Sequence, residues 1–415
     1  MSAQYLQVKE WTFVKENSVS SSWGPVTFST CGYLLKSAGD SHMDSIKANL
    51  LNNADNLNDQ SVKDDNGRPP IDDRERTILA VGDLHGDYFR LLRYLRELNF
   101  LLPGTTKWNP AADRVDLIFI GDYVDWRGEP LESSTEQSPY EALEGPRHII
   151  ELIVSIKQDM ERLRHFKYDF DSRFYPILGN HDLMMMESAK VINYLAPSFI
   201  QNTLLTTKNW PILRLQLSNK GLNDDQIEES LGFVNWWCQG GEGTAEGFGG
   251  LDKWAEIMHA GASQFLEDNL YLGVVVNGRL FSHSVPDSRE FWIPMQNLAE
   301  LPESSYLQAR ESFIWGRKVW GYDYQSGTRT RQFTDSEMTD MLDGFGCNSC
   351  VIGHTPLSRD TDHVKAYDDR VINIDVHGSP GSKAFVETYT PNENSIQAPL
   401  RSLVLRSSEV ECRVL

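Results

Sequence analysis

The sequence predicts an α/β (α+β) protein in which two packed mixed β-sheets are flanked by helices and interrupted by a helical insertion. Three observations favour this fold class. In the first half, apolar runs typical of buried strands alternate with segments of helical periodicity. In the second half, apolar runs follow one another without long helical segments between them. With 415 residues, 40% of them hydrophobic and 11% aromatic, the chain can bury a large core.

The elements of the first half follow in a regular order. Residues 77–81 are predicted to form a buried strand, and apolar residues at helical spacing follow over 89–98. A second strand is expected at 115–120, a helix at 146–165 and a third strand at 174–178. This βαβ order places the loops after parallel strands at one edge of the sheet, where open α/β sheets hold their functional sites.

The second half adds further strands after a long interruption. The segment 185–268 is too long for a plain connection, so we expect a helical insertion, with a cap over the site as one role for it. Its Gly-rich part, 239–250, lacks the ending of a phosphate-binding loop and is expected to be a flexible loop. The strands expected beyond it are 272–276, 279–283, 350–354, 371–375, 384–389 and 402–406.

The flanking segments differ from this pattern in composition. Residues 1–50 are expected to be a β-rich N-terminal extension, and residues 51–75, dense in Asn and Asp, a polar linker. The main domain then covers 76–395, and 396–415 contribute C-terminal strands that pack on the core.

Charge and composition limit the classes of partner. The formal net charge of −20 disfavours nucleic-acid binding, because an acidic surface repels polyanions. A phosphate-bearing substrate therefore requires a local positive site, which bound metal ions would provide. The sequence has no apolar run of membrane-spanning length, which argues against a membrane partner. The oligomeric state is not predicted.

The cysteines and the amino terminus indicate a reducing compartment. The chain has only 5 cysteines, an odd number, and no secretory signal is visible at its start. We expect Cys347 and Cys350 to be structural thiols, because a single CxxC cannot fill a four-ligand zinc site. The expected location is the cytoplasm, with signal-free export as an open alternative.

Short acidic and histidine-bearing strings follow the predicted strands in a fixed order: GDLHGD, GDYVDWRG, GNHD, FSHS and IGHTP. A single Gly-Asp turn is ordinary loop chemistry, but a series that mixes oxygen and imidazole donors is not. Such donors together favour Mn, Fe or Zn over Ca. The series therefore predicts a site for two divalent ions. The candidate residues are Asp83, His85, Asp122, Asn180, His181, His283 and His354.

The order and spacing of these strings resemble those of the calcineurin-like metallophosphoesterases. The chain is most similar to the phosphoprotein phosphatase type, in particular to the phage and bacterial branch that shares GHTP. The resemblance covers residues 76–390 and implies the two-sheet sandwich of that superfamily. The GHTP string disfavours the branches that have GHxH, because Pro356 stands where those have a second histidine.

The resemblance also implies roles for the metal ligands. Asp83 and His85 would bind the first ion, and Asp122 would bridge both ions. Both ions are expected to be Mn²⁺, with Fe or Zn as alternatives. The second ion would be completed by Asn180, His283 and His354. A hydroxide bridging the two ions would then attack phosphorus directly, without a phosphoenzyme.

The remaining candidates concern acid catalysis and phosphate binding. By the same resemblance, His181 would be the general acid, oriented by Asp125. The family pattern GDYVDRG is replaced by GDYVDWRG, so Trp126 occupies the usual arginine position and Arg127 is shifted by one. Arg127 and, in FIWGR, Arg317 are the candidate phosphate ligands, because guanidinium matches phosphate geometry. Trp126 and His377 are possible pocket walls.

The predicted activity is hydrolysis of phosphomonoesters on protein side chains, so the expected partner is a phosphoprotein. Trp126 favours phosphotyrosine because its indole offers a face to an aromatic leaving group, with phosphoserine and phosphothreonine as alternatives. Two other hypotheses stay open. One is a dinucleoside polyphosphate hydrolase, which shares GNHDL. The other is an inactive phosphatase-fold binding protein, which the complete ligand set disfavours.

Overall fold

The computed structural model describes most of the predicted domain. The described residues are 74–125, 143–167, 169–319, 322–323, 328–329, 332–356, 364–375, 384–391 and 399–401. The predictions for residues 1–73, for Trp126, Arg127 and His377, and for a strand at 402–406 lie outside them. The division of the chain into a 76–395 domain with flanking segments stays a prediction.

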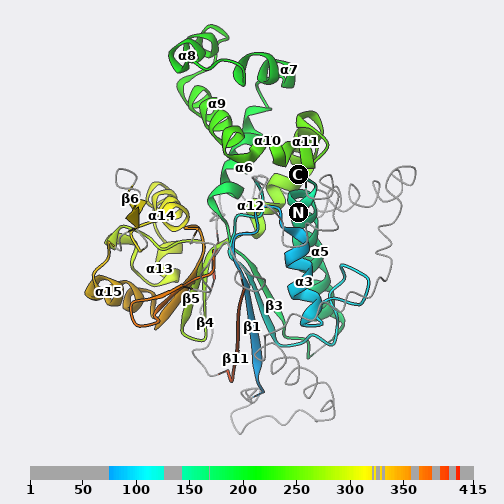
Figure 1. Ribbon diagram of the computed structural model, residues 1–415, viewed down its shortest axis with the longest axis vertical. Coiled ribbons are helices and arrows are strands. Elements are labelled where there is room, and N and C mark those ends of the chain that lie inside the picture. Colours follow the sequence, from blue (N-terminus) through cyan, green and yellow to red (C-terminus); the bar gives the residue numbers. More distant parts are fainter. Residues whose placement is uncertain are drawn as a thin grey trace.

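The first sheet is mostly parallel, and its outer face is covered by two helices (Figure 1). Its strand order is β11-β1-β2-β3, in which β1, β2 and β3 run parallel and β11 pairs antiparallel with β1. The bounds are β1 Arg76–Val81, β2 Val115–Phe119, β3 Arg173–Pro176, β11 Ala384–Tyr389, α3 Tyr88–Glu97 and α5 Gly145–Phe166.

The second sheet is mixed, with the order β12-β4-β5-β8-β10-β9. Its bounds are β4 Tyr271–Val276, β5 Arg279–Ser282, β8 Ser349–Ile352, β9 Val364–Ala366, β10 Val371–Asn373 and β12 Leu400–Arg401. The prediction that no long helices separate these strands is wrong between β5 and β8. Helices α13 (Met295–Ala299), α14 (Glu303–Trp315) and α15 (Asp335–Phe345) lie there, with a small hairpin of β6 (Tyr322–Asp323) and β7 (Thr328–Arg329).

The two sheets pack face to face, which the alternation of side chains explains. In β1, Ile78 and Ala80 belong to the cluster between the sheets, whereas Leu79 and Val81 join the core beneath the helices. Burying an isoleucine side chain contributes roughly 1.5–3 kcal/mol, so both faces stabilise the strand. The sheets also meet at one edge, where the Leu178 N–H donates to the Tyr271 carbonyl at 2.7 Å. The predicted fold class is confirmed.

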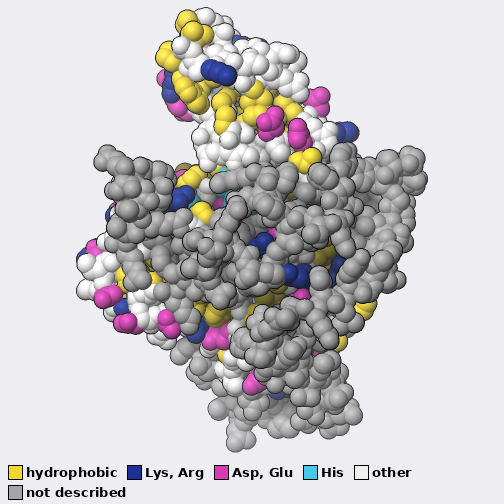
Figure 2. All heavy atoms as spheres, viewed as in Figure 1, with side chains coloured by type: hydrophobic (Ala, Val, Ile, Leu, Met, Phe, Trp, Pro, Cys, Tyr) yellow, Lys and Arg dark blue, Asp and Glu magenta, His cyan; other side chains and the backbone are white. Residues whose placement is uncertain are grey.

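Helices fill the chain between β3 and β4 and project beyond the sheets (Figure 1). α6 begins at the end of the first sheet, and α7, α8 and α9 form the tip, where hydrophobic side chains gather on the visible face (Figure 2). The bounds are α6 Asn180–Val191, α7 Pro197–Phe199, α8 Trp210–Asn219, α9 Asp224–Trp236, α10 Glu242–Gly247, α11 Leu251–Ile257 and α12 Ser263–Asn269. None of the described helices is both long and apolar enough to cross a bilayer.

The prediction of a flexible loop at 239–250 is wrong. The segment begins in a π-helical turn, η2 (Trp237–Gly241), and continues as α10. Gly240 has φ 123°, which turns the chain between the two helices, and a Cβ on Gly247 would lie 2.0 Å from the Leu143 carbonyl oxygen. These glycines therefore serve a sharp turn and close packing rather than flexibility.

Candidate metal centre

The candidate ligands lie where strands of both sheets end. Asp83 follows β1, Asp122 follows β2 and Asn180 begins α6 after β3. His283 and His354 follow β5 and β8, which run parallel in the second sheet. The carboxyl ends of these strands meet at one end of the sandwich, as expected for an α/β site.

Glycines in the motifs allow these strand ends to approach each other closely. A Cβ on Gly179 would lie 2.3 Å from Asp122 Oδ1, and a Cβ on Gly353 would lie 2.0 Å from Asp83 Oδ1. Any larger residue would therefore displace a candidate ligand. The packing of the site therefore requires the glycines that precede Asn180 and His354.

The second predicted ligand group converges on the amide oxygen of Asn180. His283 Nε2 lies 3.0 Å and His354 Nδ1 2.8 Å from Asn180 Oδ1. His283 Nδ1 lies 2.7 Å from the Ile120 carbonyl oxygen, so Nδ1 carries the proton and Nε2 presents a lone pair. That lone pair faces Asn180 Oδ1 and, at 3.5 Å, Asp122 Oδ1. Acceptor atoms that face one another in this way fit a bound cation.

The first group is built on the other oxygen of Asp122. His85 Nδ1 lies 3.1 Å from the Val124 carbonyl oxygen, which directs His85 Nε2 toward Asp122 Oδ2 at 3.7 Å. Donor atoms of His85, Asp122 and the neighbouring His181 lie within 4.8 Å of one another, as do those of Asp122, His283 and His354. Asp122 is common to both groups, as a carboxylate that bridges two ions must be.

Asp83 completes this arrangement from the side of β1. Its carboxylate accepts a hydrogen bond from the His354 backbone N–H at 2.9 Å. The Asp83 carboxylate therefore lies against the loop that carries His354 of the second ligand group. His85, two residues after Asp83 in the sequence, belongs to the first ligand group. The structure thus gathers all six predicted metal ligands at one place.

The electrostatics of the centre keep Asp122 ionised and two histidines neutral. Burial alone would raise the pKa of Asp122, but the surrounding histidines, His283 first, lower it well below its usual range. Burial lowers the pKa of His283, and burial together with the neighbouring His283 and Arg317 side chains lowers that of His354. A carboxylate and neutral imidazoles are the ligand forms that divalent cations require.

Beside the ligands lies the predicted acid pair. His181 Nδ1 is 2.7 Å from Asp125 Oδ2, and both side chains are at most 4% exposed. The His181 backbone N–H donates to Asp122 Oδ1 at 3.0 Å, which fixes the histidine next to the ligand carboxylate. Burial raises the pKa of Asp125, although the hydrogen bond to His181 opposes that rise. The predicted His181–Asp125 contact is present.

Two residues that hold Asp125 were not found by sequence reasoning. Trp236 Nε1 donates to Asp125 Oδ1 at 3.0 Å, and the Thr244 hydroxyl donates to the same oxygen at 2.8 Å. The only signal in the sequence was the Trp236–Trp237 pair next to the Gly-rich segment, and neither feature indicates a contact with Asp125.

Arg317 lies at the end of α14, where its backbone N–H donates to Asp287 Oδ1 at 3.1 Å. Its charge contributes to the lowered pKa of His354. The carbonyl of the preceding residue, Gly316, accepts a hydrogen bond from the hydroxyl of Ser284, which follows His283. Cys347 and Cys350 are buried free thiols, and burial raises the pKa of Cys347 to about 12. A thiol in that state is a packing group rather than a metal ligand.

Comparison with known proteins identifies the family. Residues 76–357 match the calcineurin-like phosphoesterase family. The chain belongs to that family. Membership of this family implies divalent metal ions, and the structure holds candidate residue groups for them. The chain is therefore a metal-dependent hydrolase.

The other comparisons add little. No curated protein matches the sequence. A cold-active protein-tyrosine phosphatase of a psychrophilic Shewanella species is 15% identical, with 75% of each chain covered and a TM-score of 0.37. A protein serine/threonine phosphatase from Saccharomyces cerevisiae is 13% identical, with 86% of this chain and 92% of the other covered and a TM-score of 0.34. Similarities at this level carry no weight for the substrate of this phosphoesterase.

Proposed function

We propose that this phosphoesterase is a phosphoprotein phosphatase that hydrolyses phosphomonoesters on protein side chains. The observation that supports this most is the His181–Asp125 pair beside two ligand groups that share Asp122. A buried imidazole oriented by a carboxylate is suited to protonate a leaving alkoxide or phenoxide. The leaving group of a phosphoprotein is such an oxygen.

The proposed metal ligands are Asp83 and His85 for one ion, Asn180, His283 and His354 for the other, and Asp122 for both. When bound, two divalent cations neutralise phosphate charge and lower the pKa of a water molecule. Mn²⁺ is the proposed native ion because the set mixes carboxylate, amide and imidazole donors.

His181 is the proposed general acid. Asp125 Oδ2 lies at Nδ1, so Nε2 is the nitrogen that faces away from the carboxylate and holds the transferable proton. The substrate phosphate is proposed to contact Arg317 and Arg127, whose guanidinium groups can each form two hydrogen bonds with it. Trp126 and His377 are proposed as walls of the pocket.

Within this function we propose a preference for phosphotyrosine. An indole stacked on a phenol ring contributes roughly 0.5–1.5 kcal/mol beyond area burial, which corresponds to about a two- to tenfold preference. Membership of the phage and bacterial branch and a cytoplasmic location belong to the same proposal. The GHTP string supports the branch, and the few scattered cysteines support the location.

The experiment is a Mn²⁺-supplemented assay of the purified chain against phosphotyrosine, phosphoserine and phosphothreonine peptides and against diadenosine polyphosphates. We expect release of phosphate from the peptides, fastest from phosphotyrosine. Turnover of the dinucleotides alone would overturn the proposal.

Variants of the shifted pair test the substrate preference separately. Trp126→Ala should lower kcat/KM for phosphotyrosine more than for phosphoserine peptides, whereas Arg127→Ala should lower both. An unchanged ratio in Trp126→Ala would show that the indole does not select the substrate.

A further inference from the structure

Both oxygens of the Asp125 carboxylate are hydrogen-bonded, and the helical insertion supplies two of the three partners. Oδ1 accepts from Trp236 Nε1 at 3.0 Å and from Thr244 Oγ1 at 2.8 Å, while the Asp125 backbone N–H donates to Thr244 Oγ1 at 2.8 Å. Asp125, Trp236 and Thr244 are all completely buried. Because both lone pairs of Oδ1 are used, Oδ2 is the oxygen presented to His181.

The two donors come from a part of the chain remote from Asp125 in sequence. Trp236 ends α9, and Thr244 lies in α10, after the turn at Gly240 and Gly241. A Cβ on Gly240 would lie 2.9 Å from Asp125 Cβ, and a Cβ on Gly241 would lie 2.5 Å from the Trp236 ring. These glycines let the insertion reach the back of Asp125.

We propose that Trp236 and Thr244 are positioning residues for acid catalysis. They fix the rotation of the Asp125 carboxylate, and Asp125 in turn fixes the tautomer and orientation of His181. The inference rests on the proposed role of His181 as general acid. It implies that the insertion is a functional part of the centre, because the orientation of the acid depends on how α9 and α10 pack.

The aromatic cluster offers a matched control. Trp254 stacks on Trp236 with ring centroids 4.8 Å apart and is equally buried. Unlike Trp236, Trp254 has an Nε1 without a hydrogen-bond partner among the described residues. Replacing each indole by phenylalanine removes similar packing, but only Trp236→Phe removes a hydrogen bond to Asp125.

The kinetic test compares two pairs of variants. Trp236→Phe and Thr244→Val should lower kcat on an alkyl phosphate about ten- to a hundredfold, the effect of losing a hydrogen bond to a charged group, and leave KM unchanged. The loss should be smaller on p-nitrophenyl phosphate, whose leaving group needs little protonation. Trp254→Phe and Thr244→Ser should stay near the wild type. An equal loss of kcat on both substrates would overturn the inference. So would an equal loss of kcat in Trp236→Phe and Trp254→Phe, or in Thr244→Val and Thr244→Ser.

A second measurement does not depend on activity. In the zinc-loaded protein, proton NMR should show a downfield His181 Nδ1–H resonance, assigned by its loss in His181→Gln. We expect it in the wild type, Trp254→Phe and Thr244→Ser, and we expect it to shift or broaden in Thr244→Val. An unchanged resonance in Thr244→Val would overturn the inference.

The NMR resonance also distinguishes a failure of the proposed phosphatase function from a failure of the proposed positioning role. If the wild type hydrolyses no phosphomonoester but the resonance responds as expected, the proposed function fails and the positioning role stands. Should Trp236→Phe not fold, the Thr244 pair decides alone.

Discussion

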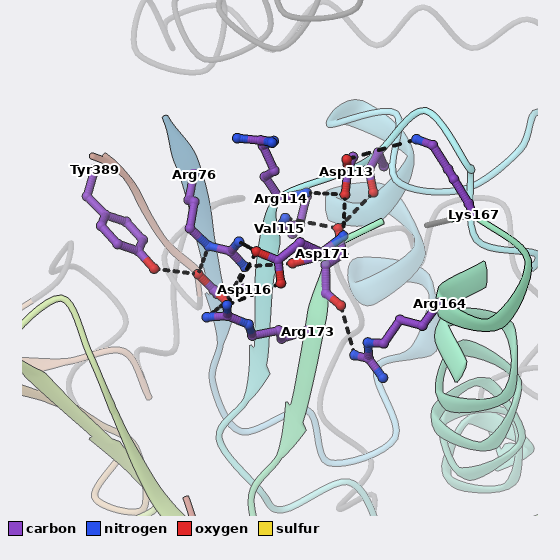
Figure 3. A network of polar contacts seen from close by, with 12 residues as sticks. Arg76, Asp113, Arg114, Val115, Asp116, Arg164, Lys167, Asp171, Arg173 and Tyr389 are labelled. Carbon is purple, nitrogen blue, oxygen red and sulfur yellow. Dashed lines mark hydrogen bonds and ion pairs between the residues drawn. The ribbon is translucent and has the colours of Figure 1, made fainter. Parts of the chain in front are cut away.

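At the amino ends of β1 and β2, the buried carboxylate of Asp116 is surrounded by cations and hydrogen-bond donors (Figure 3), whereas at the carboxyl ends oxygens of Asp122 and Asn180 meet the unprotonated ring nitrogen of His283. Asp116, which is fully buried, accepts from Arg76 Nε at 3.0 Å and Nη2 at 2.9 Å, and from the Tyr389 hydroxyl at 2.8 Å. Burial would lower the pKa of Arg76, but Asp116 raises it above its usual range. The network at this end is complete within the chain.

At the carboxyl ends, Asp122 and Asn180 face imidazole nitrogens instead. His283 donates its Nδ1 proton to the backbone, so its Nε2 lone pair meets oxygen atoms that also lack protons. The two ends of the sheet show two ways to compensate a buried carboxylate. At one end a cationic side chain of the same chain neutralises it, and at the other end the arrangement of acceptor atoms fits a cation bound from solution.

The largest expected effect is the loss of activity in Asp122→Asn, because both ligand groups share that carboxylate. Loss of several kcal/mol of transition-state stabilisation corresponds to about 10³-fold or more in kcat. Excess chelator should abolish phosphate release from the wild type, and added Mn²⁺ should restore it. Asp116→Asn is the control at the opposite end and should retain its activity per folded molecule. Full turnover in excess chelator would contradict the metal centre.

Next in size is His181→Gln, which removes the proposed acid without removing a proposed ligand. We expect about a 10²–10⁴-fold loss in kcat, the usual contribution of a general acid. The metal content, measured by atomic emission, should be unchanged. The loss should be smaller for p-nitrophenyl phosphate than for an alkyl phosphate, and equal losses would argue against acid catalysis.

The third variant, Arg76→Met, tests the other end of the sheet. Leaving Asp116 buried without its cation should lower the free energy of unfolding by about 3–5 kcal/mol. Urea denaturation measures this change. Arg76→Met combined with Asp116→Leu should recover part of the loss, because no buried charge then remains unpaired. A stable single variant would show that Tyr389 and Arg173 suffice to satisfy Asp116.

The smallest effect concerns His148 on α5, whose two ring nitrogens lie 3.3 Å from Glu144 and 3.3 Å from Glu151. Burial would lower the pKa of His148, but the two carboxylates raise it. A raised folded-state pKa stabilises the fold below the unfolded pKa, and this contribution disappears as the pH rises through the folded value. His148→Gln should therefore be less stable than the wild type at pH 5.5 and equal to it near pH 9, by thermal denaturation. The opposite trend would contradict this assignment.

Local patterns sufficed to predict most of the longer strands and the positions of the candidate ligands after them, because strand periodicity and short turns are encoded within a few residues. The short strands β9 and β12 were not predicted. His283 and His354 were found from such local patterns. Thr244 and Trp236 were not, because their contact with Asp125 arises from the packing of the insertion over a long sequence separation. The low helix propensity of glycine also favoured a loop at 239–250.

The ion-pair network at the amino ends of β1 and β2 was not predicted, for a related reason. An apolar run predicts a buried strand but does not reveal which charged residue within or beside it is buried with a partner. Arg76 and Asp116 come together only through the parallel pairing of β1 with β2. Sequence reasoning therefore located the strand ends, and tertiary structure determined which charges at those ends are neutralised by the chain.

The backbone of the metal centre has a consequence for evolution and engineering. His85, Asp122, Asp125 and His354 all have positive φ, at 43°, 50°, 67° and 66°. For a residue with a side chain this conformation costs of order 1–3 kcal/mol. Glycine at any of these positions would relieve the strain and also delete a residue of the site. Selection for thermostability alone would thus tend to remove residues of the proposed metal centre, and a library built for heat resistance should leave these four codons unchanged.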